Sequence, residues 1–152
     1  MMRHDKEITD KRVMETIIRQ ATVCRLGMSY DSIPYVIPLC FGYKDSIVYL
    51  HSALKGKRID ILRENPNICV EFDINAELIT KQTPCRWGMK FQSVIGFGKA
   101  CLVEGIDEKK DALDIIMRHY GGRIHDVDDK ALGATSVIRV EIHTMTGKQS
   151  GF

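Results

Sequence analysis

Residues 49–58, which read YLHSALKGKR, bring together side chains that favour anion binding. His51 and Ser52 follow an apolar run, and Lys57 and Arg58 precede the segment IDILRENP, which is typical of a helix. A helix start carries partial positive charge, so acids rather than cations are expected in its first turn. A bound phosphate would resolve this conflict, because free backbone N–H groups, a serine hydroxyl and two cations all attract anions. The sequence therefore predicts an anion site here, with Ser52 as the helix cap.

Two simpler interpretations of this segment stay open. The cations can form a solvated surface, and His51 can be a structural histidine rather than a catalytic one. The position directly after a strand favours binding, because rigid strands commonly hold binding loops. Two nucleotide motifs fail: IGFGKAC has Cys101 in place of a third glycine, and LKGKR has Arg58 where a Walker A loop needs Ser or Thr.

The remaining residues with chemical potential indicate neither a metal site nor a disulfide framework. The 5 cysteines are singly spaced without a C-x-x-C pair, and the histidines other than His51 have no partners at metal-ligand spacing. Trp87, the single tryptophan, ends a polar segment. It either anchors that segment on the protein body or contacts a ring or a second subunit.

Composition is typical of one soluble globular domain spanning residues 1–152. The 152 residues are 44% hydrophobic and 28% charged, with a formal net charge of +2, which favours neither nucleic-acid nor membrane binding. No apolar run approaches the roughly 20 residues of a transmembrane helix, and the first residues lack the apolar core of a signal peptide. We expect a cytoplasmic protein.

The elements that must hold these residues are six strands and three helices. The expected strands are 22–29, 34–43, 46–52, 67–74, 90–104 and 136–143. The first helix is capped by Thr9 or Asp10, the second is capped by Ser52 and closes at Pro66, and the third is capped by Asp107 and ends at Gly121. A polar loop is expected over 75–90, and at most a short helical turn over 123–134.

The order of these elements excludes a doubly wound parallel sheet, because strands and helices do not alternate regularly. The fold class predicted is mainly β, an antiparallel barrel with peripheral helices. Gly96 and Gly98 lie inside a strand pattern, where glycine marks bends and close backbone approaches.

Taken together, the motifs RLG, PYVIPLCFGY, IVYLHSALKGKR, NPNICVEFD and FQSVIGFGKA resemble the flavin-binding split-barrel proteins related to pyridoxamine 5′-phosphate oxidase. Within that family the chain is most similar to the 5-nitroimidazole resistance group, over residues 6–148. The resemblance implies a six-stranded split barrel that forms a homodimer, with FMN at the subunit interface and FAD as the alternative.

The resemblance also implies which residues contact the cofactor. Residues lining the flavin ring through their backbone would be Val36, Ile37, Pro38 and Leu39. Residues around the ribityl phosphate or the ring edge would be His51, Ser52, Lys57 and Arg58. Residues on the fifth strand at a flavin-contacting position would be Ser93 and Val94. Tyr35 stands where the parent oxidase has arginine, and Ser93 where it has glutamine.

The function implied is that of a flavin-dependent oxidoreductase that reduces a nitro group of a small aromatic compound, with His51 near the reactive ring as proton donor or substrate contact. The C-terminus, TMTGKQSGF, lacks the arginine-containing segment with which the parent oxidase binds its vitamin substrate, so pyridoxamine phosphate oxidation is not expected. The alternative is a flavin-binding redox sensor or carrier without turnover.

Overall fold

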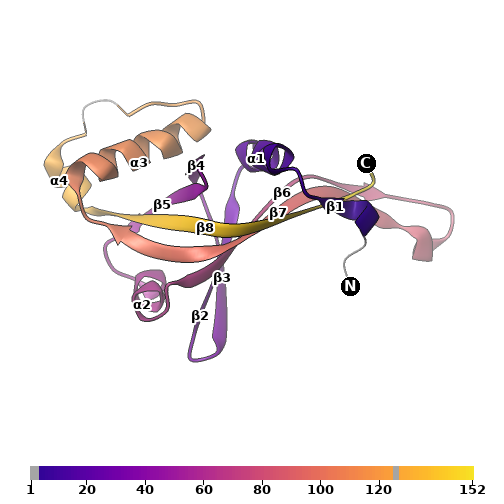
Figure 1. Ribbon diagram of the computed structural model, residues 1–152, viewed down its shortest axis with the longest axis horizontal. Helices are drawn as coiled ribbons and strands as arrows, with labels where there is room; N and C mark the ends of the chain where they lie inside the picture. Colours follow the sequence, from indigo (N-terminus) through magenta and orange to yellow (C-terminus); the bar gives the residue numbers. More distant parts are fainter. Residues whose placement is uncertain (1–3, 125–126) are drawn as a thin grey trace.

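The chain is built around one bent antiparallel sheet of eight strands, with helices packed at its periphery (Figure 1). The computed structural model describes residues 4–124 and 127–152. The strands are β1 (Glu7–Ile8), β2 (Cys24–Tyr30), β3 (Ile33–Leu39), β4 (Gly42–Lys44), β5 (Ile47–Ala53), β6 (Asn67–Ile79), β7 (Gly88–Val103) and β8 (Thr135–Ser150). The helices are α1 (Lys11–Gln20), α2 (Lys57–Glu64), α3 (Ile106–His119) and α4 (Asp129–Gly133), with 3₁₀ turns at His4–Lys6 and Pro84–Arg86. The predicted mainly antiparallel fold with peripheral helices is confirmed.

The sheet is open between its two edge strands, which are consecutive in the chain. The strand order is β3-β2-β6-β7-β8-β5-β4, with β1 added beside β8, and every pair is antiparallel. Only Cys40 and Phe41 separate β3 from β4. Phe41 is fully buried, and its ring meets that of Phe72 edge-on at 5.0 Å between centroids. This aromatic pair fills the interior where the edge strands are not paired with each other.

The six strands expected from the sequence all form, but the strand count and several boundaries were wrong, most of all at the last strand, which continues to Ser150 and not only to residue 143. The sheet has eight strands because the expected strand 34–43 is interrupted after Leu39, which creates the short β4, and because β1 adds to β8.

Two tight hairpin turns join β2 to β3 and β4 to β5. Their central residues have positive φ, at Asp31 and Ser32 in the first turn and at Asp45 and Ser46 in the second. Consecutive positive φ values are typical of two-residue hairpins that match the twist of the strands.

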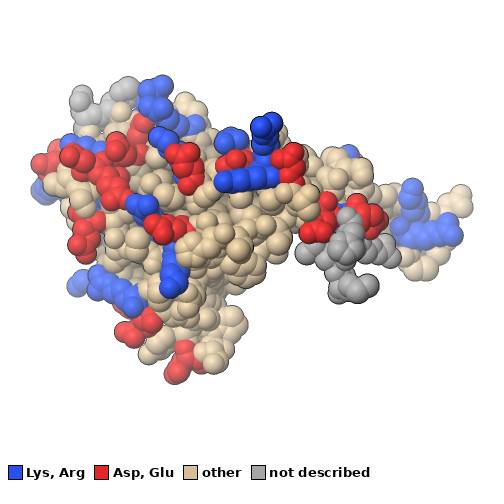
Figure 2. Space-filling view, in the orientation of Figure 1, with Lys and Arg blue, Asp and Glu red and all other residues tan. Residues whose placement is uncertain are grey.

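The polar loop expected over 75–90 is instead a two-stranded arm. β6 and β7 continue their pairing beyond the barrel, with Leu78 opposite Met89, after an irregularity between Ile74 and Glu77. The sequence does not indicate these strands, because an arm has no buried face and its apolar and polar residues therefore do not alternate. Trp87 lies near the tip, is 49% exposed and donates from Nε1 to the carbonyl of Lys81 at 2.7 Å. Lys and Arg side chains gather at the same tip (Figure 2).

The cap predicted for α1 is confirmed, and the cap predicted for α3 is wrong. Asp10 caps α1 by accepting the N–H of Arg12 at 2.8 Å, and the core-facing side of α1 carries Met14 and Ile17. The expected Asp107 cap of α3 was wrong: Gly105 is the N-cap, and Asp107 lies in the first turn, where its charge suits the helix dipole.

The prediction for the two glycines of β7 is confirmed by a close strand contact. The pairing of β7 with β8 shifts register between Phe97 and Gly98. A Cβ on Gly98 would overlap the carbonyl oxygen of Glu141, and one on Gly96 would lie 3.1 Å from a methyl group of Ile142. Only glycine fits this crossing of the two long strands.

Two further predictions concern absences. None of the helices in the described part of the chain has the length and apolar character needed to cross a bilayer. Among residues 4–124 and 127–152, no three His, Cys, Asp or Glu side chains come together as a metal site, and His125 lies outside these ranges.

Candidate functional site

The helix start that the sequence singled out is preceded by an exposed turn. Gly56, not Ser52, is the N-cap of α2, with φ of 148° and without a side-chain cap hydrogen bond, so the predicted serine cap was wrong. Ser52 belongs to β5, four residues earlier. The amide of Asp60 donates to the Gly56 carbonyl, which leaves the first N–H groups of α2 without partners inside the helix. The backbone N–H groups at this helix start are thus available to a ligand, as at any helix start, and the anion site stays a prediction.

Lys57 connects this helix start to β3, the strand predicted to line the flavin ring. Its Nζ atom lies 4.6 Å from the ring centroid of Tyr35, within cation–π distance. Arg58, next in the helix, is half-buried, and Ile59 fixes the turn by packing into the core at 2% exposure. Two segments about twenty residues apart in sequence thus meet at the start of α2.

β3 offers an exposed edge next to this contact. It pairs with β2 on one side and forms the edge of the sheet on the other. The Val36 and Pro38 side chains are exposed, whereas Ile37 and Leu39 pack against the core. The strand can therefore present both apolar side chains and unpaired backbone groups to a planar ligand.

His51 and Ser52 lie next to each other on β5 but point to opposite faces, as successive strand residues do. His51 is exposed and pairs in register with Val137 of β8, while Ser52 pairs with the buried Ser136. Only one of the two side chains can therefore approach a given face of the sheet.

The two predicted residues on β7 also point to opposite faces of the sheet. Val94 is fully buried in the core, so its side chain takes no part in a surface site. Ser93 faces outward, in register with Asp73 of β6 and Lys148 of β8. Within the predicted set, Ser93 is thus the residue of β7 whose side chain is available to a ligand.

Sequence reasoning missed a charged cluster beside Ser93. The Nη1 atom of Arg25 lies 2.7 Å from Asp73 Oδ2 and 3.9 Å from Glu71 Oε1. The pKa of Glu71 is raised from 4.5 to about 7, first by burial, then by the hydrogen bond and charge of Asp73, against the opposing charge of Arg25. Acids at positions i and i+2 of a predicted strand share one face, and this spacing in NICVEFDI was the available signal.

A cavity of about 330 Å³ opens beside this cluster on the outer face of β6 and β7. It is lined by Glu71, Asp73, Ala76, Met89, Phe91 and Ser93. Carboxyl groups form one part of its wall, and an aromatic ring and a thioether form another. Such a combination of apolar surface and few polar groups is typical of small-molecule sites.

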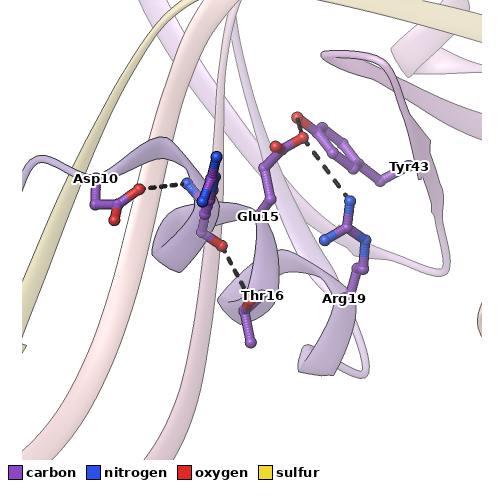
Figure 3. A network of polar contacts seen from close by, with 6 residues as sticks. Asp10, Glu15, Thr16, Arg19 and Tyr43 are labelled. Atoms are coloured by element: carbon purple, nitrogen blue, oxygen red, sulfur yellow. Dashed lines mark hydrogen bonds and ion pairs between the residues drawn. The ribbon is translucent and has the colours of Figure 1, made fainter.

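A larger cavity, of about 800 Å³, contains none of the predicted site residues. It lies between α1, β4, β5 and α3, and its lining includes Arg19, Tyr43 and His119. Tyr43 donates to Glu15 at 2.8 Å and Arg19 lies 4.0 Å from the same carboxylate, a network that holds α1 against β4 (Figure 3). Burial, followed by the bond to Glu15, raises the pKa of Tyr43 to about 12. The Glu15, Tyr43 and Arg19 side chains therefore interact with one another. The predicted site residues lie outside this cavity, on β3, β5, α2 and β7.

Comparisons with known proteins bear on the family and the fold of the chain. The sequence pattern of the pyridoxamine 5′-phosphate oxidase family matches residues 10–149. No curated protein matches the chain. A Bacteroides thetaiotaomicron structure, provisionally assigned as a 5-nitroimidazole antibiotic resistance protein, is 38% identical, with a TM-score of 0.84 over 93% of this chain and 85% of its own.

Two more distant structures share the fold. The flavocytochrome Anf3 from Azotobacter vinelandii is 21% identical, with a TM-score of 0.82 over 100% of this chain and 73% of its own. An FAD and heme binding protein from Mycobacterium smegmatis is 18% identical, with a TM-score of 0.87 over 97% of this chain and 74% of its own. At these identities the two structures show that the fold is shared.

The raised pKa of Glu71 predicts a specific pH dependence of stability. The folded protein holds this proton more tightly than the unfolded chain does, so the stabilisation is complete below pH 4.5 and is lost as the pH rises to about 7. We expect the free energy of unfolding of Glu71→Gln, relative to the parent protein, to rise across this window. Urea unfolding at a series of pH values measures it. Asp73→Asn should move the window to lower pH, and parallel curves for all three proteins would contradict the assignment.

Proposed function

The chain belongs to the pyridoxamine 5′-phosphate oxidase family, and from this premise we propose that it is a flavin-dependent oxidoreductase that reduces the nitro group of small aromatic compounds. The similarity to the protein provisionally assigned to 5-nitroimidazole resistance, at 38% identity over 93% of the chain, carries the choice of substrate. The contact between Lys57 and Tyr35 supports the cofactor site, because it joins the cationic helix start to an exposed edge strand.

In this proposal FMN is the cofactor, and FAD is the alternative because a phosphate site alone does not exclude an attached adenylate. Lys57, Arg58 and the free N–H groups of α2 bind the phosphate, with Ser52 contributing from the end of β5. The ring lies along β3, over the backbone of residues 36–39, and reaches Ser93 and the strand at Val94. The flavin supplies the redox chemistry, and the chain supplies position, charge and exclusion of water.

A homodimer completes the site in this proposal. Val36, Gly27, Cys69 and Phe97 form one row across the outer face of four strands, through the registers of β3, β2, β6 and β7. Val36 is 62% exposed and Phe97 51%, and glycine between them keeps the row flat. An exposed apolar strip on a sheet face is typical of an interface, and a second copy supplies the same strip by two-fold symmetry. The outer face also carries Ser93, so the dimer covers the flavin.

The chromophore of the purified protein tests the proposal directly. We expect a yellow protein that releases FMN or FAD on denaturation and, once reduced, passes electrons to a 5-nitroimidazole. A colourless protein that cannot be reconstituted with either flavin would exclude the proposal. Bound flavin without electron transfer to any nitroaromatic would instead favour a sensor or carrier.

Removing the two cations at the start of α2 should weaken flavin binding. Each lost charged hydrogen bond costs about 1.5–3 kcal/mol, so Lys57→Ala with Arg58→Ala should raise the dissociation constant at least about tenfold. Fluorescence titration of the flavin-free protein measures this. Arg63→Ala, in the last turn of the same helix, is the matched control and should bind flavin normally. Equal affinity of the double variant and the control would rule out the phosphate site.

His51 should affect turnover and not flavin binding, because we place it near the reactive ring as a proton donor or substrate contact. His51→Ala should keep its flavin and lose about 100-fold in nitroreduction. Steady-state kinetics on the flavin-loaded protein measures the loss, and His143→Ala, which removes another exposed histidine, serves as control. Full activity of His51→Ala would leave this residue with a structural role only.

A charge placed in the apolar strip should separate the subunits. Phe97 is 51% exposed in one chain, so Phe97→Glu leaves the folded chain intact but buries an unpaired carboxylate in the dimer. We expect light scattering to report a dimer for the parent protein and a monomer with lower flavin occupancy for the variant. Met117→Glu, at a residue of α3 that is 42% exposed, should stay dimeric. A parent protein that is already monomeric would refute the dimer.

A further inference from the structure

We propose that the cavity on the outer face of β6 and β7 holds the oxygen-bearing group of the electron acceptor, and that Glu71 donates a proton to this group. This inference rests on the proposed function, which assigns neither a substrate pocket nor a proton donor on these strands. It makes Glu71 a catalytic residue of the nitroreduction.

The cavity has the size and lining that a small aromatic acceptor requires. Its volume is about 330 Å³, and it lies on the outer face of β6 and β7, at the lower end of the range for ligand pockets. Phe91 and Met89 offer an aromatic face and a polarizable thioether to a planar ring, while Ser93 and Glu71 offer polar atoms to its substituent. A nitro group accepts hydrogen bonds, so it needs donors on this side.

The charges around Glu71 favour its acid form as such a donor. Arg25 of β2 is committed to Asp73 of β6 at 2.7 Å. The Oε1 atom of Glu71 is shielded from solvent and has no hydrogen-bond partner among the described residues, with Arg25 3.9 Å away. Burial and the neighbouring carboxylate raise the pKa of Glu71 to about 7, so near neutral pH a substantial fraction carries a proton.

Lys148 of β8 adds a second cation near the cavity. It is in register with Ser93, and its Nζ atom lies 5.9 Å from the ring centroid of Phe91. Glu7 of β1 is in register with Lys148 on the other side of β8, so each cation has a carboxylate beside it, Asp73 for Arg25 and Glu7 for Lys148. With Glu71 protonated, these charges balance, and the cavity no longer has an excess carboxylate that would repel the electron-rich oxygens of an acceptor as they gain charge during reduction.

Ser93 connects the cavity to the cofactor. It lines the cavity, and it is also one of the proposed flavin contacts on β7. An acceptor in the cavity therefore lies next to the flavin, while the acid side chain approaches from β6.

The proton balance of the reaction requires one proton from the protein, which this acid can donate. Reduction of a nitro group to a nitroso group takes two electrons and two protons, breaks one N–O bond and releases the oxygen as water. When bound, a two-electron-reduced flavin would supply both electrons and one of the two protons. Glu71 supplies the second proton to the departing oxygen and regains one from solvent afterwards, which leaves His51 the role of substrate contact.

Binding can be tested without turnover. In the oxidised, flavin-loaded protein, adding a 5-nitroimidazole should shift the carboxyl carbon resonance of Glu71 and the methyl resonance of Met89, and the Glu71 resonance should titrate near pH 7. Resonances that do not respond to saturating ligand would overturn the cavity as the acceptor site.

Turnover tests the proton transfer. Glu71→Gln preserves size and polarity but cannot give a proton, so kcat should fall about 100-fold at unchanged flavin content. The loss of activity above about pH 7 in the parent protein should disappear in this variant, and Glu71→Asp should restore part of the rate. Glu104→Gln, at an exposed residue just beyond β7, is the control. An unchanged kcat and pH profile in Glu71→Gln would overturn the proton donor alone, whereas a parent protein that reduces no nitroaromatic would also remove the proposed function.

Discussion

The continuous pairing of β7 with β6 on one side and β8 on the other is the constraint on which the rest of the structure depends. Because β7 alternates strictly between faces, it buries Val94 in the core and places Ser93, Ile95 and Phe97 outside. The close crossing at Gly98 fixes its register against β8, since any Cβ there would overlap the Glu141 carbonyl. A register shift of one residue would turn the core-facing side chains of β7 outward and would turn Ser93 into the core.

Much of this architecture is readable from the sequence, because the barrel strands bury one face. The pattern of apolar and polar residues located all six long strands, and the glycines at 96 and 98 indicated the close contact of β7 with β8. The arm could not be predicted, because its side chains contact solvent on both faces and leave no periodic signal. The short β4 could not be separated from β3 either, because Phe41 continues the apolar run while the backbone leaves the sheet.

The candidate site, too, could be predicted from the sequence only in part. The unusual charge at the start of α2 was visible in sequence, but its meeting with β3 depends on how α2 packs against the sheet, which local pattern does not specify. The Ser52 cap was wrong because β5 runs on through Ala53, so the turn at Gly56 and not a side chain begins the helix. Arg25, Glu71 and Asp73 were missed because a charged outer face normally means only contact with water.

The proposed dimer and the proposed proton donor reinforce each other physically. The apolar strip and the Arg25–Asp73–Glu71 cluster lie on the same face of the sheet, so a second copy that covers one also removes water from the other. Arg25 and Asp73 already neutralise each other at 2.7 Å and tolerate this loss, but the additional carboxylate of Glu71 does not. Dimer formation therefore favours the protonated form of Glu71. In this proposal, the interface that encloses the flavin also favours the protonated form of Glu71 from which the proton is donated.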